Sequence, residues 1–147
     1  SPISILREIK RVAKPGGTIA ILAEPDYSNR IDQPVEFEYL GKAQTKSLQS
    51  QGANPMIGGQ LPTIFSYLNL ENVEVGQYSN SKSSRSYSEW ELEWEILEFD
   101  LKKGNFPEPM KKYEDIDIKA RNEGSRKLTI PTHFAIGTKG VQNEREN

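Results

Sequence analysis

The sequence predicts an α/β fold in which helices pack on a small mixed sheet, and three consecutive segments support this prediction. Residues 3–13 place apolar side chains at helical spacing, with charged side chains between them. The turn at residues 14–17 (Lys-Pro-Gly-Gly) ends this helix, because proline breaks the hydrogen-bond ladder and glycine allows a tight reversal. Residues 18–23 follow as a strand of apolar and β-branched residues, and we expect both of its faces to be covered. A helix, a short turn and such a strand form half of a βαβ unit.

A polar loop and a long helix are expected next. Residues 24–30 leave the strand as the loop. Asp32 stands where a helix N-cap is expected, and Pro34 suits the first helical turn. The helix then continues along an apolar stripe to about residue 51, and Gly52 ends it.

The middle of the chain predicts a short helix, a strand and a second long helix. A glycine- and proline-rich break precedes the short helix, which includes residues 64–70. Residues 72–78 alternate apolar and polar side chains, which indicates a strand with one face to solvent. Ser88 and Glu91 have the spacing of a capping box, so we expect the long helix to begin there and to end before Gly104.

The last part of the chain predicts a weaker helix that ends near Gly124 and a final strand. The strand occupies residues 127–138 and is broken or bulged at Pro131. No linker or internal repeat is recognisable, so we expect one domain over residues 1–140. Residues 141–147 are expected to be a frayed tail.

Composition excludes several classes of protein. The chain has 147 residues, with 19 basic and 21 acidic side chains and a net charge of −2. This balance argues against a nucleic-acid binder or a binder of anionic membranes, because both need a basic surface. The absence of cysteine excludes a disulfide framework, a thiolate zinc site and a cysteine nucleophile. The longest apolar run, residues 19–23, is too short to cross a bilayer and no leader is recognisable, so we expect a cytoplasmic protein.

Four polar residues follow the first predicted strand: Glu24, Asp26, Tyr27 and Arg30. The carboxyl ends of strands in an α/β sheet form the edge where ligands bind, so these four are candidates for a substrate site. The alternative is a solvated loop in which Asp26 and Arg30 serve as turn residues or form an ion pair. On the sequence alone both interpretations stay open.

Three further features have a functional and a structural interpretation. His133 is the only histidine and could act as a general base, but no nucleophile or second ligand accompanies it, which favours a structural role. The acidic run within residues 89–100 is spread around a helix, which favours a solvated face over a metal site. Trp90 and Trp94 could form a wall over a substrate or meet a partner, but their spacing with Leu97 favours a buried stripe. We therefore name no catalytic residue and no metal site.

Residues 6–21 resemble the late conserved segment of class I S-adenosylmethionine-dependent methyltransferases. In that family a helix ending in Arg-Val-Leu-Lys-Pro-Gly-Gly precedes the fifth strand of the sheet, and here Ala13 replaces the leucine. Residues 24–32, 51–55 and 131–140 are similar to a bacterial and archaeal branch of small-molecule methyltransferases. The resemblance implies a Rossmann-like fold in which the edge that carries the four candidate residues faces the substrate.

The resemblance also implies that the cofactor-binding half of the fold is absent. The family holds S-adenosylmethionine with a glycine-rich turn after its first strand and an acidic residue after its second strand. Neither Gly-x-Gly-x-x-Gly nor Gly-x-Gly-x-Gly occurs here, and the pair Gly58 and Gly59 follows no predicted strand. Ser1 and Pro2 resemble the linker after the family's fourth strand. We therefore expect a fragment, the C-terminal half of a methyltransferase, which alone neither binds S-adenosylmethionine nor transfers a methyl group.

On this resemblance the sheet consists of residues 18–23, 131–138 and 72–78, with the second of these strands central. The first strand lacks its natural neighbour and presents an unpaired apolar edge, which is a template for pairing. We expect either a homodimer through residues 19–23 or the missing N-terminal half at this edge. The alternative function is a non-catalytic remnant that associates with itself or with a partner.

Overall fold

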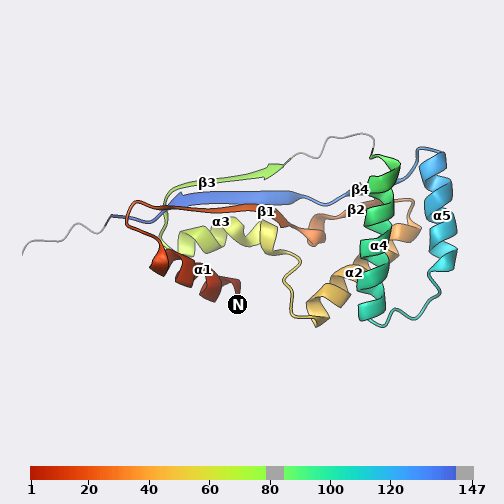
Figure 1. Ribbon diagram of the computed structural model, residues 1–147, viewed down its shortest axis with the longest axis horizontal. Helices are drawn as coiled ribbons and strands as arrows, with labels where there is room; N and C mark the ends of the chain where they lie inside the picture. Colours follow the sequence, from red (N-terminus) through yellow and green to blue (C-terminus); the bar gives the residue numbers. More distant parts are fainter. Residues whose placement is uncertain (79–84, 142–147) are drawn as a thin grey trace, which may run out of the picture. The chain divides into compact units, whose positions relative to one another are not determined.

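The computed structural model describes residues 1–78 and 85–141, so the predicted tail at 141–147 lies outside it apart from Val141. In this part of the chain, five α-helices and five strands occur, which confirms the α/β class (Figure 1). The chain forms two compact units, and each unit is assembled from segments that are distant in sequence. Unit 1 consists of Ser1–Asp26, Met56–Ser79 and Thr132–Asn147, and unit 2 consists of Tyr27–Pro55 and Asn80–Pro131.

Unit 1 contains a three-stranded sheet. Its strands are β1 (Thr18–Pro25), β5 (Thr132–Thr138) and β3 (Glu71–Tyr78), in the order β1-β5-β3. The expected order, with the last strand of the sequence in the centre, is confirmed. The expected mixed sheet is wrong, because β5 runs antiparallel to both of its neighbours. Ile21 pairs with Ala135, which places both side chains on the same face.

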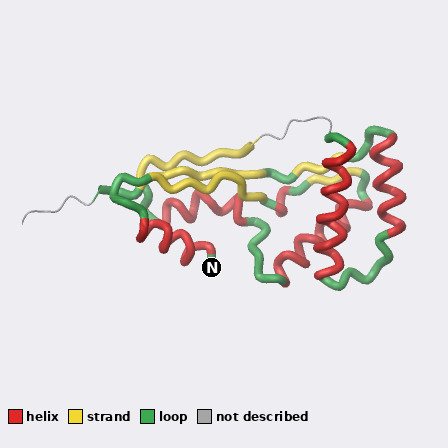
Figure 2. The backbone as a smooth tube through the Cα atoms, in the orientation of Figure 1, coloured by secondary structure: helices red, strands yellow, loops and turns green. Residues whose placement is uncertain are grey.

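Two helices, α1 (Pro2–Val12) and α3 (Ile57–Tyr67), cover that face of the sheet. Figure 2 shows both helices on the same side of the three strands. Burial of each large apolar side chain between the helices and the sheet stabilises the unit by about 1.5–3 kcal/mol. This core consists of Leu6, Ile19, Leu61, Ile64, Phe65, Leu68, Leu70 and Ala135.

The expectation that both faces of residues 18–23 are covered is wrong. Ile19 is 4% exposed, whereas Leu22 is 57% exposed. Because α1 and α3 form a single layer on one side of the sheet, the side chains that point to the other side of β1 are not covered by them. β1 is also an edge strand of this sheet.

The turn at residues 14–17 connects α1 to β1 as its sequence predicts. Gly16 has a φ of +75°, a conformation that residues with a Cβ disfavour. The N–H of Gly16 donates to Lys139 O at 2.8 Å, and the N–H of Lys139 donates to Gly17 O at 2.9 Å. The Lys139 ammonium also donates to Ala13 O at 2.8 Å, at the helix end where unpaired carbonyls favour a cation. The end of α1 is therefore fastened to the residues that follow β5.

Unit 2 is mainly helical. Its helices are α2 (Glu36–Ser50), α4 (Tyr87–Lys103) and α5 (Lys111–Asn122), and α2 packs against α4. A short antiparallel pair, β2 (Ile31–Gln33) and β4 (Lys127–Thr129), completes the unit. Its core consists of Phe37, Leu40, Leu97, Leu101 and Tyr113.

Asp32 is not the helix N-cap that the sequence predicts. It lies in β2, opposite Leu128 of β4, and α2 begins at Glu36. The side chain of Asp32 is 2% exposed and forms ion pairs with Arg30 and Arg126. These two arginines, rather than the N–H groups of a helix end, satisfy its carboxylate.

The start of α4 also differs from the prediction by two residues. Its capping box is formed by Ser86 and Glu89, not by Ser88 and Glu91, although both pairs have the required spacing. The predicted break at Pro131 is confirmed, because this residue separates β4 from β5.

Candidate functional site

The four candidate residues divide between the two units. Glu24 and Asp26 belong to unit 1, whereas Tyr27 and Arg30 belong to unit 2. Glu24 lies in β1 and pairs in register with His133 of β5. Asp26 is 4% exposed and lies beside the first turn of α3.

The glycine pair of unit 1 allows α3 to approach the end of β1. A Cβ on Gly58 would lie 2.9 Å from Pro25 O and closer still to Glu24 O. A Cβ on Gly59 would lie 2.9 Å from Oδ2 of Asp26. The Asp26 carboxylate therefore lies at the N-terminal turn of α3, where the helix dipole favours negative charge. This position supports the structural interpretation of Asp26.

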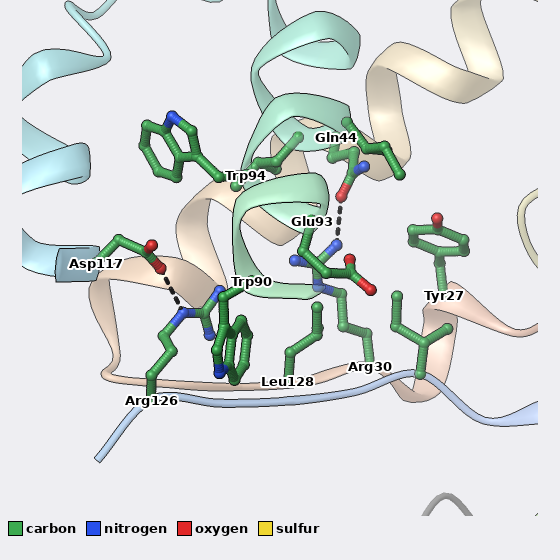
Figure 3. Close-up of a pocket in the computed structure, with 12 residues that line it drawn as sticks. Tyr27, Arg30, Gln44, Trp90, Glu93, Trp94, Asp117, Arg126 and Leu128 are labelled. Atoms are coloured by element: carbon green, nitrogen blue, oxygen red, sulfur yellow. Dashed lines mark hydrogen bonds and ion pairs between the residues drawn. The ribbon is translucent and has the colours of Figure 1, made fainter. Parts of the chain in front are cut away.

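Tyr27 and Arg30 line a pocket of unit 2 with a cavity volume of about 180 Å³ (Figure 3). The guanidinium of Arg30 lies 5.9 Å from the centre of the Tyr27 ring, within the range of a cation–π contact. Other walls of the pocket come from α2, α4, α5 and β4. The sequence did not nominate the polar side chains that these elements contribute, which are Gln44, Glu93, Asp117 and Arg126.

Arg30 is buried in the wall of this pocket, and each of its nitrogens has an acceptor. Nε lies 2.5 Å from Asp32 Oδ2, and Nη2 donates to Asp32 Oδ1 at 3.2 Å. Nη1 donates to Gln44 Oε1. The side chain of Arg30 is 6% exposed. Its carboxylate partner within unit 2 is therefore Asp32.

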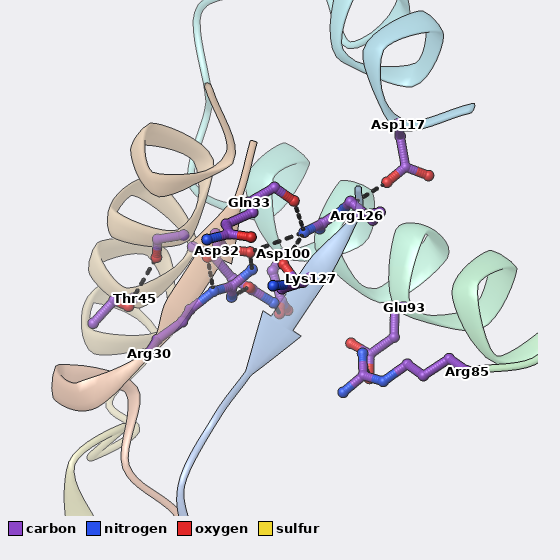
Figure 4. Close-up of polar contacts among 12 residues, drawn as sticks. Arg30, Asp32, Gln33, Thr45, Arg85, Glu93, Asp100, Asp117, Arg126 and Lys127 are labelled. Carbon is purple, nitrogen blue, oxygen red and sulfur yellow. Dashed lines mark hydrogen bonds and ion pairs between the residues drawn. The ribbon is translucent and has the colours of Figure 1, made fainter. Parts of the chain in front are cut away.

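Arg126 is a second buried guanidinium in this wall, and Figure 4 shows its partners. Its Nε donates to Asp117 Oδ1 at 2.9 Å, and its Nη1 donates to Gln33 O at 3.0 Å. The guanidinium also lies 3.9 Å from the centre of the Phe37 ring. Burial lowers the pKa of Arg126, while Asp117 and Asp32 act in the opposite direction. The acceptors offset the cost of removing this charge from water.

The same network extends into α4 and α5. Gln44 Nε2 donates to Asp100 Oδ2 at 2.7 Å, and Arg121 Nε lies 2.9 Å from Asp117 Oδ2. Positive and negative charges are equal in number within this network, which we call the buried charge network. Its charged members are Asp32, Asp100 and Asp117, and Arg30, Arg121 and Arg126.

A less buried wall of the pocket is formed by Tyr27, Trp90 and Glu93, beside the two buried arginines. Tyr27 is half-buried, and this burial raises the pKa of its hydroxyl. The side chain of Glu93 is 36% exposed, and its Oε1 lies 3.2 Å from Arg85 Nη1. Two guanidiniums lie over the Trp90 ring, that of Arg85 at 4.9 Å and that of Arg126 at 5.0 Å. This wall can hold a ligand by charge and by contact with aromatic faces.

For the two tryptophans, the sequence left a wall over a substrate and a partner surface as alternatives to a buried stripe. Their spacing favoured a buried stripe, whereas both are half-buried and both line the pocket. Trp94 also packs against the core of unit 2, with its ring centre 6.5 Å from that of Phe37. His133 lies half-buried in unit 1, in register with Glu24 and Gln77 on the neighbouring strands.

The class of protein rests on the fold and the pocket. Among residues 1–78 and 85–141, no group of three or more His, Asp or Glu side chains could hold a metal ion. None of the helices in this part is long and apolar enough to cross a membrane. No protein-family model matches the chain, and no curated protein matches its sequence. The fold and the pocket define an α/β protein with a small polar and aromatic pocket in unit 2.

Proposed function

We propose that this chain is the C-terminal, substrate-side part of an S-adenosylmethionine-dependent methyltransferase that acts on a small molecule in the cytoplasm. The strand order of unit 1 carries this proposal. A helix, a Lys-Pro-Gly-Gly turn and a strand lead into the sheet, and β5 lies between β1 and β3. The family that residues 6–21 resemble implies this order, which therefore supports the resemblance independently of those residues.

The substrate contacts are proposed to lie in the polypeptide that follows β1. Tyr27 and Arg30 line the pocket of unit 2, together with Trp90 and Glu93. In methyl transfer, the main task of the enzyme is to hold the acceptor in line with the donor methyl group. Side chains that bind and orient, without a nucleophile, are sufficient for that task. Tyr27 is therefore a substrate-side residue in this proposal, and Arg30, whose nitrogens are all engaged by Asp32 and Gln44, positions the pocket wall beside it. Neither is a catalytic residue.

The pair Gly58 and Gly59 does not fit the cofactor. The family's glycine-rich turn lets a ligand approach the backbone, but the space beside Gly58 is filled by the backbone of residues 24–25. We therefore assign S-adenosylmethionine to the N-terminal half of the fold, which the resemblance places before residue 1. Residues 1–147 alone are not expected to transfer a methyl group.

Exposed apolar side chains of unit 1, including one on the edge strand β1, support a partner for this unit. Ile5 and Val12 of α1 are each 63% exposed, and Leu22 of β1 is 57% exposed. In the whole enzyme we place the N-terminal half at this edge. When the chain is alone, we propose that a second copy pairs with residues 19–23, which is also how a non-catalytic remnant would associate.

Radiolabelled S-adenosylmethionine tests the proposed function. The full-length gene product and residues 1–147 are each incubated with the labelled cofactor and a pool of small metabolites. We expect label on a metabolite with the full-length protein only, and no calorimetric binding of the cofactor to residues 1–147. Micromolar binding by residues 1–147 would show that the cofactor half is not missing. A full-length protein without a glycine-rich turn and without methyl transfer would reject the function itself.

A further inference from the structure

The buried wall of the unit 2 pocket offers little to an anion. All three nitrogens of Arg30 have acceptors, and Arg126 is engaged by Asp117 and by Asp32. An anionic ligand would have to displace carboxylates that are already desolvated and paired, which is costly. The groups that remain to recognise a ligand are on the less buried wall formed by Tyr27, Trp90 and Glu93, where Glu93 supplies a carboxylate outside the buried charge network.

Arg85 shows which chemistry this wall accepts. Its guanidinium lies 4.9 Å from the centre of the Trp90 ring, and its Nη1 lies 3.2 Å from Glu93 Oε1, a pair that Figure 4 shows. Nη1 is buried, yet it makes no hydrogen bond within the described residues. Charge and the aromatic face therefore hold this cation, without a directional bond from Nη1 that would fix it in place.

We propose that this wall is a binding site for a small organic cation, a guanidinium or primary ammonium compound, for which Arg85 is a built-in competitor. Glu93 supplies the counter-charge, and Trp90 and Tyr27 supply aromatic faces. The cavity of about 180 Å³ is smaller than the roughly 300–1,000 Å³ of pockets for drug-sized ligands, so the ligand is correspondingly small. The site does not depend on the proposed methyl transfer.

Benzamidine and benzamide form a matched pair of probes, because they have nearly the same planar shape and only benzamidine is charged. The chain contains two tryptophans, Trp90 and Trp94, and both line this pocket, so intrinsic fluorescence reports on it directly. We expect benzamidine to change the fluorescence saturably and benzamide to leave it unchanged. Equal binding of the two probes, or binding of neither, would overturn the proposal.

Substitutions on this wall separate the counter-charge from the competitor. Glu93→Gln should weaken benzamidine binding about tenfold, whereas Glu95→Gln, at an exposed position of the same helix, should not change it. Arg85→Ala should strengthen binding about tenfold by removing the competitor, and Arg85→Lys should stay close to the parent protein.

Circular dichroism during heating shows whether each variant keeps the fold. Among variants that keep the fold, an unchanged affinity of Glu93→Gln for benzamidine would overturn the role of the Glu93 charge. Weaker binding by Arg85→Ala would overturn the competitor role, because it would make Arg85 part of the site.

Discussion

Asp32 is the carboxylate shared by two buried arginines of unit 2. Its Oδ2 lies 2.5 Å from Arg30 Nε, and its Oδ1 lies 3.4 Å from Arg126 Nη1. Removing one partner from a buried ion pair leaves the other charge uncompensated, which costs about 3–5 kcal/mol. We therefore expect Asp32→Asn to lower the free energy of unfolding by about that amount.

Urea unfolding followed by tryptophan fluorescence measures this effect, since both tryptophans belong to unit 2. The exposed ion pair of Lys111 with Glu114 provides the control, with side chains 72% and 40% exposed. Glu114→Gln should cost less than about 1 kcal/mol, because solvent screens such a pair. A similarly small loss for Asp32→Asn would show that the buried charge network does not stabilise unit 2.

Replacing Gly58 by alanine should destabilise the protein, which is the opposite of the usual effect of this substitution in a helix. Replacing a helical glycine by alanine normally stabilises a protein by up to about 1 kcal/mol. At Gly58 the added Cβ would lie 2.9 Å from Pro25 O, and such overpacking costs about 1–3 kcal/mol. We expect Gly58→Ala to lower the melting temperature measured by far-UV circular dichroism. Thr63→Ala, at an exposed position of α3, should not lower it, and a rise for Gly58→Ala would contradict the close approach.

At the scale of elements, local pattern predicts the longer helices and strands, and it predicts β4 as the first part of the broken strand 127–138, but it does not predict β2. The helix before residues 14–17 and the strand after them follow from side-chain periodicity and turn chemistry. β2 has three residues, too few for a recognisable alternation, and it is defined by its pairing with β4. Asp32 resembles an N-cap in sequence because it stands just before Pro34 and the helix. Its partner Arg126 is 94 residues away, beyond the reach of local pattern.

The start of α4 could not be predicted because two capping boxes overlap there. Ser86 Oγ accepts from Glu89 N at 3.3 Å, and Ser86 N donates to Glu89 Oε2 at 2.6 Å. Ser86→Ala should therefore lower the free energy of unfolding by about 0.5–2 kcal/mol. Ser88→Ala should change it by less than about 0.5 kcal/mol, because Ser88 does not cap the helix. Urea unfolding of the two variants decides between the two boxes, and a larger loss for Ser88→Ala would favour the one predicted from sequence.

At the scale of the whole molecule, the division into two units explains why most of the pocket escaped prediction. Unit 2 is made of residues 27–55 and 80–131, two segments separated by part of unit 1. A glycine- and proline-rich break at residues 52–59 and a serine-rich stretch at residues 79–86 stand at two of these boundaries, but neither shows that residues 27–55 and 80–131 fold together. Tyr27 and Arg30 could be nominated because they follow a strand, whereas Glu93 and Arg126 join them only through folding of the second segment.

The edge of β1 determines how the whole molecule should associate when it is alone. Two copies joined through residues 19–23 would form a particle of twice the monomer mass in light scattering. Leu22 is exposed in this edge strand, so Leu22→Lys should prevent pairing and leave a folded monomer in circular dichroism. Lysine is a residue that natural edge strands use to block such pairing.

Leu92 of α4 provides a control with the same exposed fraction, because Leu22 and Leu92 are each 57% exposed. Leu92→Lys should leave the dimer intact, since it adds the same charge to unit 2 instead of the β1 edge. Dissociation by both variants would indicate a general effect of charge, and a compact, cooperatively unfolding monomer of the parent chain at micromolar concentration would exclude edge pairing. Dissociation by Leu22→Lys alone would assign the association to β1, because the two variants differ only in where the charge lies.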